Sequence, residues 1–256
     1  MVVRGGLRKG RVSEVAYWLI KAIVKPIMLG LYRIKVEGLE NVPKKGSAII
    51  AANHLSFLDS FFIPLVIKRR KMTYLAKADY FKSWKTSWFF KSVGQISCER
   101  EGGKKSQQSL EIALDVLKEG HLLGIYPEGT RSPDGYLYRG RTGVARLALQ
   151  SGASVIPVGL VGTEDVMPID RKFPRLTGRV KVTVKIGKPL DFSRFAGQED
   201  DRFALRSVTD EIVYEIMRLS GQEYKDEYAS KKSTVPLPES VRIDDEINLS
   251  EEIIAS

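Results

Sequence analysis

The sequence predicts an α/β protein, with a mainly parallel mixed sheet flanked by helices and an amphipathic helical segment at its N-terminus. Short apolar runs alternate along the chain with longer segments that repeat apolar residues every three or four positions. This alternation of strand and helix patterns favours a parallel sheet covered by helices on both faces. In addition, polar segments directly follow several of the apolar runs, and α/β sheets bind their ligands at that end of the strands.

The composition limits the class of partner and of site. The 256 residues are enough for one sizeable core, and the formal net charge of +10 implies an anionic partner: nucleic acid, an anionic membrane surface, or a phosphorylated or carrier-bound substrate. Cys98 is the single cysteine, so the chain has no intramolecular disulfide and no multi-cysteine metal site, and two histidines argue against a histidine metal cluster. We therefore expect no metal, no cofactor and a reducing, cytoplasmic setting.

The N-terminal segment, residues 12–32, is apolar but interrupted by charges. Those charges and Pro26 argue against a cleaved signal or a transmembrane span. We expect an amphipathic, membrane-associated helix that lies in one leaflet, with Lys21 and Lys25 on its polar face. Pro26 and Gly30 are expected to break it into a hairpin that returns to the same side; the alternative is a helix packed on the protein's own core. The residues that supply apolar area are Trp18, Leu19, Ile23, Ile27 and Leu31.

The next stretch combines strand patterns with an unusual aromatic segment. Residues 80–91 hold two of the three tryptophans among lysines, a combination that suits the headgroup region of a membrane. The alternative is a surface helix whose aromatic face packs on the core. The elements expected before this segment are strands at 33–37, 48–52 and 71–77, a turn at 38–46 and a helix at 60–67.

Further elements complete the main body of the chain. Pro157 lies within one of the expected strands and would have to occupy an edge or a bulge, because proline lacks a backbone N–H. Near its end the chain becomes polar and acidic, which indicates a loose tail. These patterns divide the chain into an N-terminal segment (1–33), an α/β domain (34–228) and a tail (229–256). The expected strands are 93–100, 122–126, 155–160 and 181–186, and the expected helices are 106–119, 141–150 and 202–219.

His54 follows the apolar run 48–52 and is the first candidate for chemistry. Histidine takes up a proton near neutral pH, and a carboxylate can fix its tautomer and stabilise the resulting cation. Residues five apart on one helix point ~140° apart, so His54 and Asp59 meet only if His54 precedes the helix and Asp59 lies in its first turn. Ser56 as the helix N-cap allows this arrangement. The alternative is that Asp59 only caps the helix and His54 is a buried loop histidine.

Two further polar segments follow expected strands. Residues 128–131 combine a carboxylate, a glycine that lets the backbone approach a ligand, and an arginine that can grip a phosphate. The alternative is a surface turn with a local Glu–Arg pair. Arg100 ends the strand expected at 93–100. Because the carboxyl ends of parallel strands meet at one rim, we expect residues 53–59, Arg100 and 128–131 to converge there.

Four segments in order resemble the four motifs of the glycerophospholipid acyltransferase family. They are Asn53-His54-x-x-x-x-Asp59-Ser60, Gly94 to Arg100, Tyr126-Pro127-Glu128-Gly129-Thr130-Arg131-Ser132, and Val155-Ile156-Pro157-Val158. The third is most similar to that of the 1-acyl-sn-glycerol-3-phosphate (lysophosphatidic acid) acyltransferases. The resemblance covers residues 36–190. It departs at Cys98-Glu99, where family members often carry an aromatic residue and an aspartate.

The resemblance implies an enzyme that transfers an acyl group from a thioester, of acyl carrier protein or coenzyme A, to the sn-2 hydroxyl of lysophosphatidic acid, giving phosphatidic acid. It implies that His54 is the general base and that Asp59 orients it. Arg100 and Arg131 would bind the acceptor phosphate. The other implied site residues are Glu128, Gly129 and Thr130 around that phosphate, Lys104 and Lys105 as further cations unless they form a solvated face, and Pro157 as acyl-pocket wall or support for His54.

Three alternatives stay open. His54 could activate Cys98 or Ser56 for a covalent acyl-enzyme, although Cys98 lies in an apolar strand and Ser56 is explained as a cap. The acceptor could be glycerol 3-phosphate or another lysophospholipid. The basic balance and the aromatics could mark a nucleic-acid surface, but no basic stripe lies on one recognition helix. We therefore expect an anionic membrane as partner and no nucleic acid, with the protein peripheral or monotopic at the cell membrane and its site on the cytoplasmic side.

Overall fold

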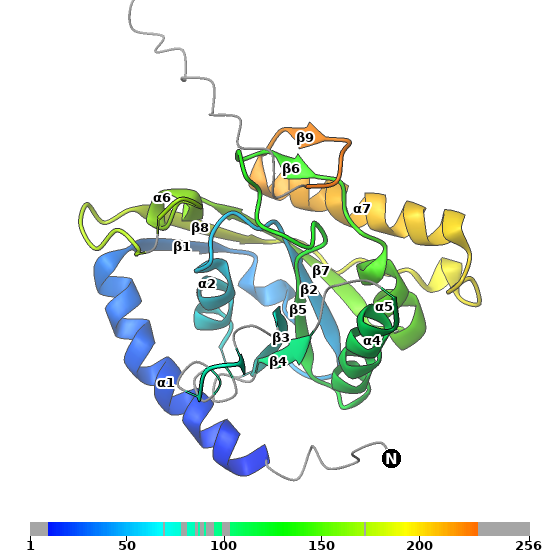
Figure 1. Ribbon diagram of the computed structural model, residues 1–256, viewed down its shortest axis with the longest axis horizontal. Helices are drawn as coiled ribbons and strands as arrows, with labels where there is room; N and C mark the ends of the chain where they lie inside the picture. The colour runs from blue at the N-terminus through cyan, green and yellow to red at the C-terminus, as the bar shows by residue number, and fades with distance from the viewer. Residues whose placement is uncertain are drawn as a thin grey trace, which may run out of the picture.

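The computed structural model describes residues 10–68, 70–77, 81–84, 87, 90, 95–98, 103–171 and 173–229. These residues form a seven-stranded mixed sheet flanked by helices, with a small two-stranded sheet beside it (Figure 1), so the predicted α/β class with a mixed sheet flanked by helices is confirmed. The strands are β1 (Arg33–Glu37), β2 (Ala48–Ala52), β3 (Met72–Lys77), β4 (Ile96–Cys98), β5 (Leu122–Ile125), β6 (Leu137–Tyr138), β7 (Ser154–Val161), β8 (Lys181–Ile186) and β9 (Tyr224–Lys225). The helices are α1 (Gly10–Leu31), α2 (Asp59–Val66), α4 (Gly103–Lys118), α5 (Gly143–Ser151), α6 (Thr163–Val166) and α7 (Arg202–Ser220), with 3-10 turns at Leu39–Asn41 and Ser193–Phe195.

The strand order of the large sheet is β1-β8-β7-β2-β5-β3-β4. The strands from β7 to β4 run parallel, whereas β7 and β8 are antiparallel and β8 pairs in parallel with β1. β2 lies at the centre, and every one of its residues is buried. A strand buried on both faces needs no polar alternation, so the continuous apolar run Ala48–Ala52 forms this central strand.

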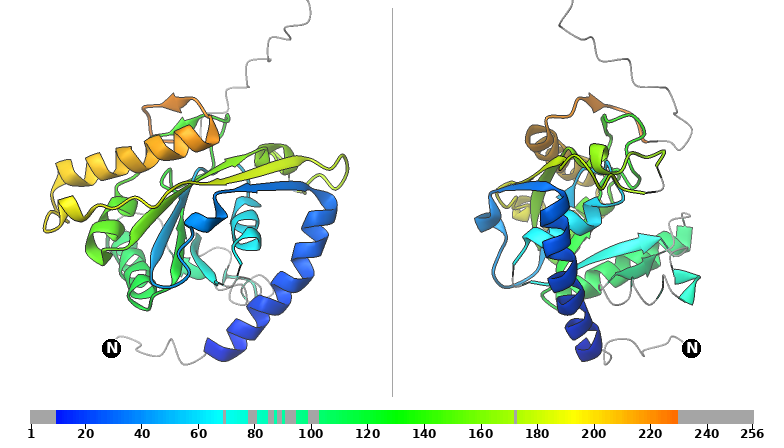
Figure 2. Two further views of the ribbon diagram at one scale, coloured as in Figure 1. Left: turned by 180° about the vertical axis from the view of Figure 1, so that it is seen from behind. Right: turned by 90° about the vertical axis from the view of Figure 1, so that its left-hand side faces the viewer.

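Hydrophobic clusters cover both faces of the sheet. Alternate side chains of β2 point to opposite faces: Ile50 packs in the cluster that includes α1 and α2, while Ile49 packs in the cluster that includes α4, α5 and α7. Figure 1 shows the helices on both sides of the sheet, and Figure 2 shows the same arrangement from behind and from the side. The buried sheet therefore holds the strand ends, where the polar segments begin, in fixed positions.

α1 runs as one helix through Pro26, so the expected break into a hairpin is wrong. Proline removes one intrahelical hydrogen bond, but the helix continues because both of its halves are held against the body. Tyr17 and Met28, on either side of Pro26, are both buried. Between them, Nζ of Lys21 donates a hydrogen bond of 2.5 Å to the carbonyl of Ile67, at the end of α2.

The outer side of α1 is apolar. Leu19, Ile23 and Ile27 are each more than half exposed, at 59%, 63% and 54%. Lys21 is instead turned toward the body, where burial and then the charge of Lys25 lower its pKa to about 8. The alternative expectation, a helix packed on the core, therefore explains the buried residues on the inner side of α1. It does not explain the apolar residues exposed on the outer side. None of the helices in the described part of the chain is long and apolar enough to cross a membrane.

Pro157 lies in β7, an interior strand, so of the two places expected for it, an edge or a bulge, the edge is wrong. The regular antiparallel ladder between β7 and β8 begins at Val158, one residue after the proline. The Pro157 carbonyl still accepts a hydrogen bond of 2.8 Å from the N–H of Gly187. The missing N–H is therefore tolerated because it falls where the regular pairing with β8 ends.

Some predicted features lie outside the described residues. These are Arg100, half of the aromatic segment 80–91, and the tail from residue 230 onward. The boundaries of the other elements differ from the predicted ones by a few residues; α4, for example, begins at Gly103. The small β6–β9 sheet and the short helix α6 were not predicted, because two-residue strands and a single helical turn carry no periodic pattern.

Candidate active site

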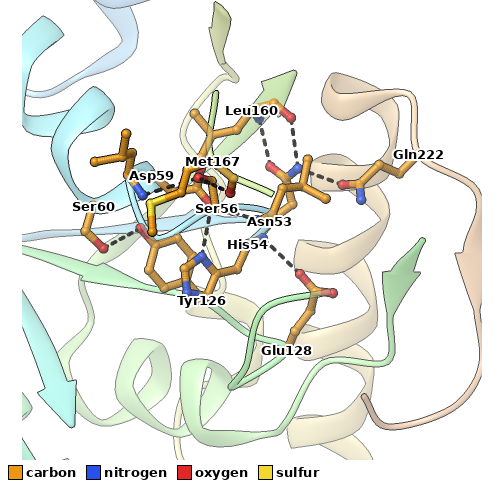
Figure 3. Close-up of polar contacts among 12 residues, drawn as sticks. Asn53, His54, Ser56, Asp59, Ser60, Tyr126, Glu128, Leu160, Met167 and Gln222 are labelled. Atoms are coloured by element: carbon orange, nitrogen blue, oxygen red, sulfur yellow. Dashed lines mark hydrogen bonds and ion pairs between the residues drawn. The ribbon is translucent and has the colours of Figure 1, made fainter. Parts of the chain in front are cut away.

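His54 and Asp59 lie side by side at the carboxyl end of β2. The Nδ1 atom of His54 is 2.9 Å from Oδ2 of Asp59 (Figure 3). As their spacing requires, His54 precedes α2 and Asp59 is its first residue. The Asp59 side chain is fully buried, whereas the His54 side chain is 15% exposed. A histidine that is braced by a buried carboxylate and reaches the surface has the geometry of a general base.

Asp59 is held by the backbone that precedes its helix. Its Oδ2 accepts hydrogen bonds from the N–H groups of Leu55 and Ser56, each 2.8 Å long. The N-cap of α2 is Leu58, two residues after the predicted cap at Ser56, although Oγ of Ser56 accepts a hydrogen bond of 3.4 Å from the Leu58 N–H. The Ser56 hydroxyl also donates to the carbonyl of Met167 at 3.1 Å. One carboxylate oxygen of Asp59 thus closes the turn before α2 and also contacts the imidazole of His54. The same atom therefore serves both the structure of the turn and the placement of the histidine.

The loop after β5 wraps around the backbone of His54. Oε1 of Glu128 accepts a hydrogen bond of 3.1 Å from the His54 N–H, and the Ser132 N–H donates a hydrogen bond of 2.7 Å to the His54 carbonyl. Both main-chain polar groups of the histidine are therefore paired with this loop. The expected meeting of residues 53–59 and 128–131 at one rim of the sheet is confirmed.

Glu128 lies behind His54 in the interior. It is 1% exposed, and its second carboxylate oxygen accepts a hydrogen bond of 3.0 Å from the N–H of Tyr138. Burial raises the pKa of Glu128 to about 8, opposed by the two backbone hydrogen bonds and reinforced by the charges of Asp59 and Asp134. Because its carboxylate faces two backbone N–H groups, the structure places Glu128 as a brace between the histidine and β6.

Tyr126, the first residue of the third motif, has a role in the site that was not predicted. Its ring stacks on the His54 imidazole, with 3.9 Å between ring centroids and 9° between planes. Its hydroxyl is 2.9 Å from the hydroxyl of Ser60, in the first turn of α2 (Figure 3). A flat aromatic face against the ring fixes the ring orientation. The contact depends on the pairing of β2 with β5, which no local pattern reveals.

Asn53 links the start of the segment between β2 and α2 to β7. It is fully buried, its Oδ1 accepts from the Leu160 N–H at 2.7 Å, and its Nδ2 donates to the Leu160 carbonyl at 2.9 Å. Nδ2 also donates to Oε1 of Gln222, beyond α7, at 2.7 Å. The amide is therefore fully satisfied in the interior, as a buried polar group must be. It links the residue before His54 to a rigid strand.

A second arginine, Arg141, lies against the loop that contains Gly129 and Arg131. Gly129 has φ of 76°, a left-handed conformation that glycine adopts without strain, and a Cβ there would lie 3.0 Å from Nε of Arg141. The Arg141 guanidinium also lies over the ring of Tyr228, 5.3 Å from its centroid. Arg131 and Thr130 are half-buried in the same loop. The prediction missed Arg141 because it stood at the start of an expected helix, where a basic residue is unremarkable.

The remaining predicted site residues divide into two groups. Pro157 is buried in β7 opposite Ala51 of β2, within the sheet that carries His54. Arg100 and the side chains of Cys98, Lys104 and Lys105 lie outside what the structure describes. Within the described residues, no group of three or more His, Cys, Asp or Glu is placed to hold a metal ion.

Comparison with known proteins places this site in a family context. The chain is 30% identical over 164 residues to a chloroplastic 1-acyl-sn-glycerol-3-phosphate acyltransferase of Arabidopsis thaliana, covering 64% of this chain and 45% of that protein. It is 29% identical over 193 residues to the Bacillus subtilis 1-acyl-sn-glycerol-3-phosphate acyltransferase, covering 74% of this chain and 89% of that one. The chain thus spans about half the length of the plant relatives that it matches.

The fold also matches a solved structure. The crystal structure of the 1-acyl-sn-glycerophosphate acyltransferase from Thermotoga maritima superposes with a TM-score of 0.59 at 26% sequence identity, covering 80% of this chain and 83% of that one. The sequence model of the Acyltransferase family matches residues 33–161, about half of the chain. That range runs from β1 to the end of β7 and contains His54, Asp59 and the loop that encloses them. The chain therefore belongs to the Acyltransferase family.

Proposed function

We propose that this protein transfers an acyl group from an acyl thioester to the sn-2 hydroxyl of 1-acylglycerol 3-phosphate, giving phosphatidic acid for phospholipid synthesis. The observation that carries the proposal is the contact of 2.9 Å between His54 and Asp59 at the end of β2, enclosed by residues 128–132. Relatives that share this region carry the name of the same reaction, which supports this choice of acceptor over glycerol 3-phosphate or another lysophospholipid.

In the proposed mechanism His54 acts as a general base. The ionised Asp59 accepts a hydrogen bond from Nδ1–H, so Nε2 carries the lone pair that takes the proton of the acceptor hydroxyl. The hydroxyl oxygen forms a bond to the thioester carbonyl carbon. The carbon–sulfur bond then breaks, and the imidazolium returns the proton to the sulfur. The products are phosphatidic acid and a free thiol, and the histidine is restored for the next cycle.

The imidazolium that forms during transfer needs stabilisation. Asp59 supplies a buried negative charge at Nδ1, and Tyr126 supplies the face of an aromatic ring. Glu128 acts one step further away, as a positioning residue that fixes the backbone of His54. Base catalysis of this kind contributes ~10²–10⁴-fold to the rate.

The acceptor phosphate is assigned to the cations around Gly129. Arg141 lies against this glycine, and Arg131 is two residues further along the same loop. Arginine can grip a phosphate through two parallel hydrogen bonds, and the glycine lets the backbone approach it closely. The resemblance adds Arg100 as a third arginine for this phosphate. It also adds Thr130 for its hydroxyl group, Lys105 as a further cation, and Pro157 as support for the acyl pocket.

Direct transfer is proposed over a covalent acyl-enzyme. The Ser56 hydroxyl is fully buried and donates to the Met167 carbonyl, so its proton is not directed at the imidazole of His54. A serine nucleophile would need that contact for activation. The acceptor hydroxyl therefore takes the place that a protein nucleophile would occupy.

We further propose that α1 holds the protein at an anionic membrane surface, with the active site on the cytoplasmic side. Leu19, Ile23 and Ile27 expose an apolar stripe, while Lys21 of the same helix faces the protein body. The net charge of +10 favours anionic lipids. A lipid acceptor is presented at such a surface, so docking there would bring the site to its substrate.

The experiment that tests the reaction is product identification. The protein is incubated with 1-acylglycerol 3-phosphate in vesicles and with either acyl carrier protein or coenzyme A as the thioester donor, and phosphatidic acid is measured by mass spectrometry. We expect product only when the acceptor is present, with at least one donor. Transfer to glycerol 3-phosphate or another lysophospholipid, without transfer to 1-acylglycerol 3-phosphate, would contradict the acceptor assignment. Folded, membrane-bound protein that transfers from neither donor would contradict the activity.

A further inference from the structure

We infer that the loop between α6 and β8 is a second membrane-contact surface, which binds anionic lipid headgroups and inserts apolar side chains beside them. This α6–β8 loop comprises residues 167–171 and 173–180. The inference rests on the proposed action at a membrane surface and extends it to a part of the chain that lies beyond the matched family region, which ends at residue 161. The loop projects at one end of the large sheet, beside the carboxyl end of α1 (Figure 1, Figure 2).

The loop exposes large apolar side chains. Phe173 is 80% exposed, Leu176 is 62% exposed and Ile169 is 45% exposed. Large apolar side chains that are this exposed, and that belong to one loop, indicate a surface that is covered in function. An exposed aromatic ring and two exposed aliphatic chains in one loop suit the boundary between lipid headgroups and acyl chains.

Hydrogen bonds hold the backbone of the α6–β8 loop at Met167 and at Arg175. The exposed apolar side chains therefore project from a backbone that is fixed at these two residues. The Arg175 N–H donates to the Val166 carbonyl at 2.7 Å, and the Arg175 carbonyl accepts from the hydroxyl of Tyr32, at the end of α1, at 2.9 Å. The Met167 carbonyl accepts from the hydroxyl of Ser56, in the turn before α2. The loop is therefore tied both to the proposed membrane helix and to the active-site turn.

The charge of the loop identifies the partner. Arg171, Arg175 and Arg179 are exposed, and Lys181 follows at the start of β8. Asp170 is the single acidic residue among the described residues of the loop. Basic side chains interleaved with exposed apolar ones complement a surface that is both negatively charged and apolar, which describes an anionic bilayer. A soluble acidic protein, such as an acyl carrier, would match the arginines but would leave the ring of Phe173 unexplained.

Binding to vesicles tests this surface without reference to catalysis. Full-length protein is sedimented with vesicles of phosphatidylcholine alone, or of phosphatidylcholine with phosphatidylglycerol, across a range of lipid concentrations. Phe173→Ala with Leu176→Ala is expected to weaken binding to both by on the order of tenfold or more, because apolar area is no longer buried. Arg171→Ala and Arg175→Ala are each expected to cost about fivefold on anionic vesicles and nothing on neutral ones.

Matched controls lie at the other end of the molecule. Phe203, in the first turn of α7, is 85% exposed, and Arg202 precedes it. α7 begins at the opposite end of the sheet from the loop (Figure 1, Figure 2). Phe203→Ala and Arg202→Ala are expected to leave vesicle binding unchanged. Equal losses in the control and loop variants, or wild-type binding by the loop variants, would overturn the inference.

Two further outcomes separate other occupants and the proposed reaction. If the loop variants bind vesicles normally but lose only the transfer from acyl carrier protein, the loop is a carrier-docking surface and the inference fails. If they bind vesicles normally but lose a self-association that wild type shows by sedimentation equilibrium, the occupant is a second copy and the inference also fails. Selective loss of vesicle binding supports the inference even if no acyl transfer is detected, because that result would contradict the proposed function alone.

Discussion

A single carboxylate oxygen organises the candidate site at the residue scale. Oδ2 of Asp59 lies 2.9 Å from Nδ1 of His54 and accepts hydrogen bonds from the N–H groups of Leu55 and Ser56. The same atom that fixes the turn before α2 therefore sets the orientation of the imidazole. Glu128 and Tyr126 complete this arrangement, one holding the histidine backbone and the other holding its ring.

Tyr126 provides a prediction that separates its ring from its hydroxyl. Tyr126→Phe keeps the stacked ring but loses the contact with Ser60, so we expect near wild-type kcat and a loss of stability of about 0.5–1.5 kcal/mol. Tyr126→Leu removes the aromatic face, so we expect kcat to fall while KM for the acceptor stays close to wild type. Steady-state kinetics and urea unfolding measure the two effects. If Tyr126→Leu changes KM and leaves kcat intact, the ring does not act through His54.

Glu128 provides a prediction about pH and stability. Its pKa in the folded protein is about 8, above its ordinary value of 4.5, so the folded state holds an extra proton between these values. The free energy of unfolding therefore falls as pH rises through this window. Glu128→Gln carries no titratable proton and is expected to flatten that fall in urea unfolding across pH. Glu40→Gln, at an exposed position, is the control. The same pH slope in Glu128→Gln as in wild type would show that Glu128 does not cause it.

Cys98 provides a test of direct transfer. If the acceptor hydroxyl attacks the thioester itself, Cys98→Ala retains most of the wild-type activity, because no thiol takes part in the chemistry. Acyl transfer by the variant and trapping of any labelled acyl-enzyme would be measured together. Loss of activity in folded Cys98→Ala would point to a covalent intermediate. An acyl label that is trapped on wild type but not on Cys98→Ala would point to the same conclusion.

At the element scale, the most informative difference between expectation and structure is α1. Its amphipathic pattern was recognised in the sequence, but Pro26 and Gly30 were expected to divide it. The break is absent because Tyr17 and Met28 hold both halves of the helix against the body. A proline lowers local helix stability, whereas contacts between residues distant in sequence decide whether the helix continues.

The outer side of α1 leads to a prediction about lipid binding. Leu19→Ser, Ile23→Ser and Ile27→Ser together are expected to weaken vesicle binding by on the order of tenfold or more, because apolar contact with lipid is lost. Their effect on the free energy of unfolding should stay within roughly 0.5 kcal/mol for each change, since the side chains are already exposed.

Ile112→Ser provides the matched control for that prediction. This aliphatic residue is exposed on α4, which packs in the cluster on the opposite face of the sheet from α1. The control is expected to bind vesicles like wild type. If the three α1 substitutions leave vesicle binding unchanged, the helix is not a membrane contact.

At the scale of the whole molecule, the sequence predicted which segments form strands and that polar residues follow their carboxyl ends. It did not predict the contacts that depend on which strands are neighbours in the sheet. Apolar runs such as Ala48–Ala52 identified the strands, and their carboxyl ends brought His54 and Glu128 to one rim. The stacking of Tyr126 on His54 follows from β2 lying beside β5, which no local pattern contains. The exposed Phe173 was overlooked for a related reason, because exposure is a property of the folded chain.

The most direct test of the central claim compares wild type with His54→Ala and Asp59→Asn in acyl transfer to 1-acylglycerol 3-phosphate on vesicles. Circular dichroism and vesicle binding confirm beforehand that each variant is folded and docked. The account predicts that His54→Ala lowers kcat by ~10²–10⁴-fold and that Asp59→Asn also lowers kcat, both without a matching change in lipid binding. Transfer by folded His54→Ala at the wild-type rate would contradict the assignment of His54 as the base.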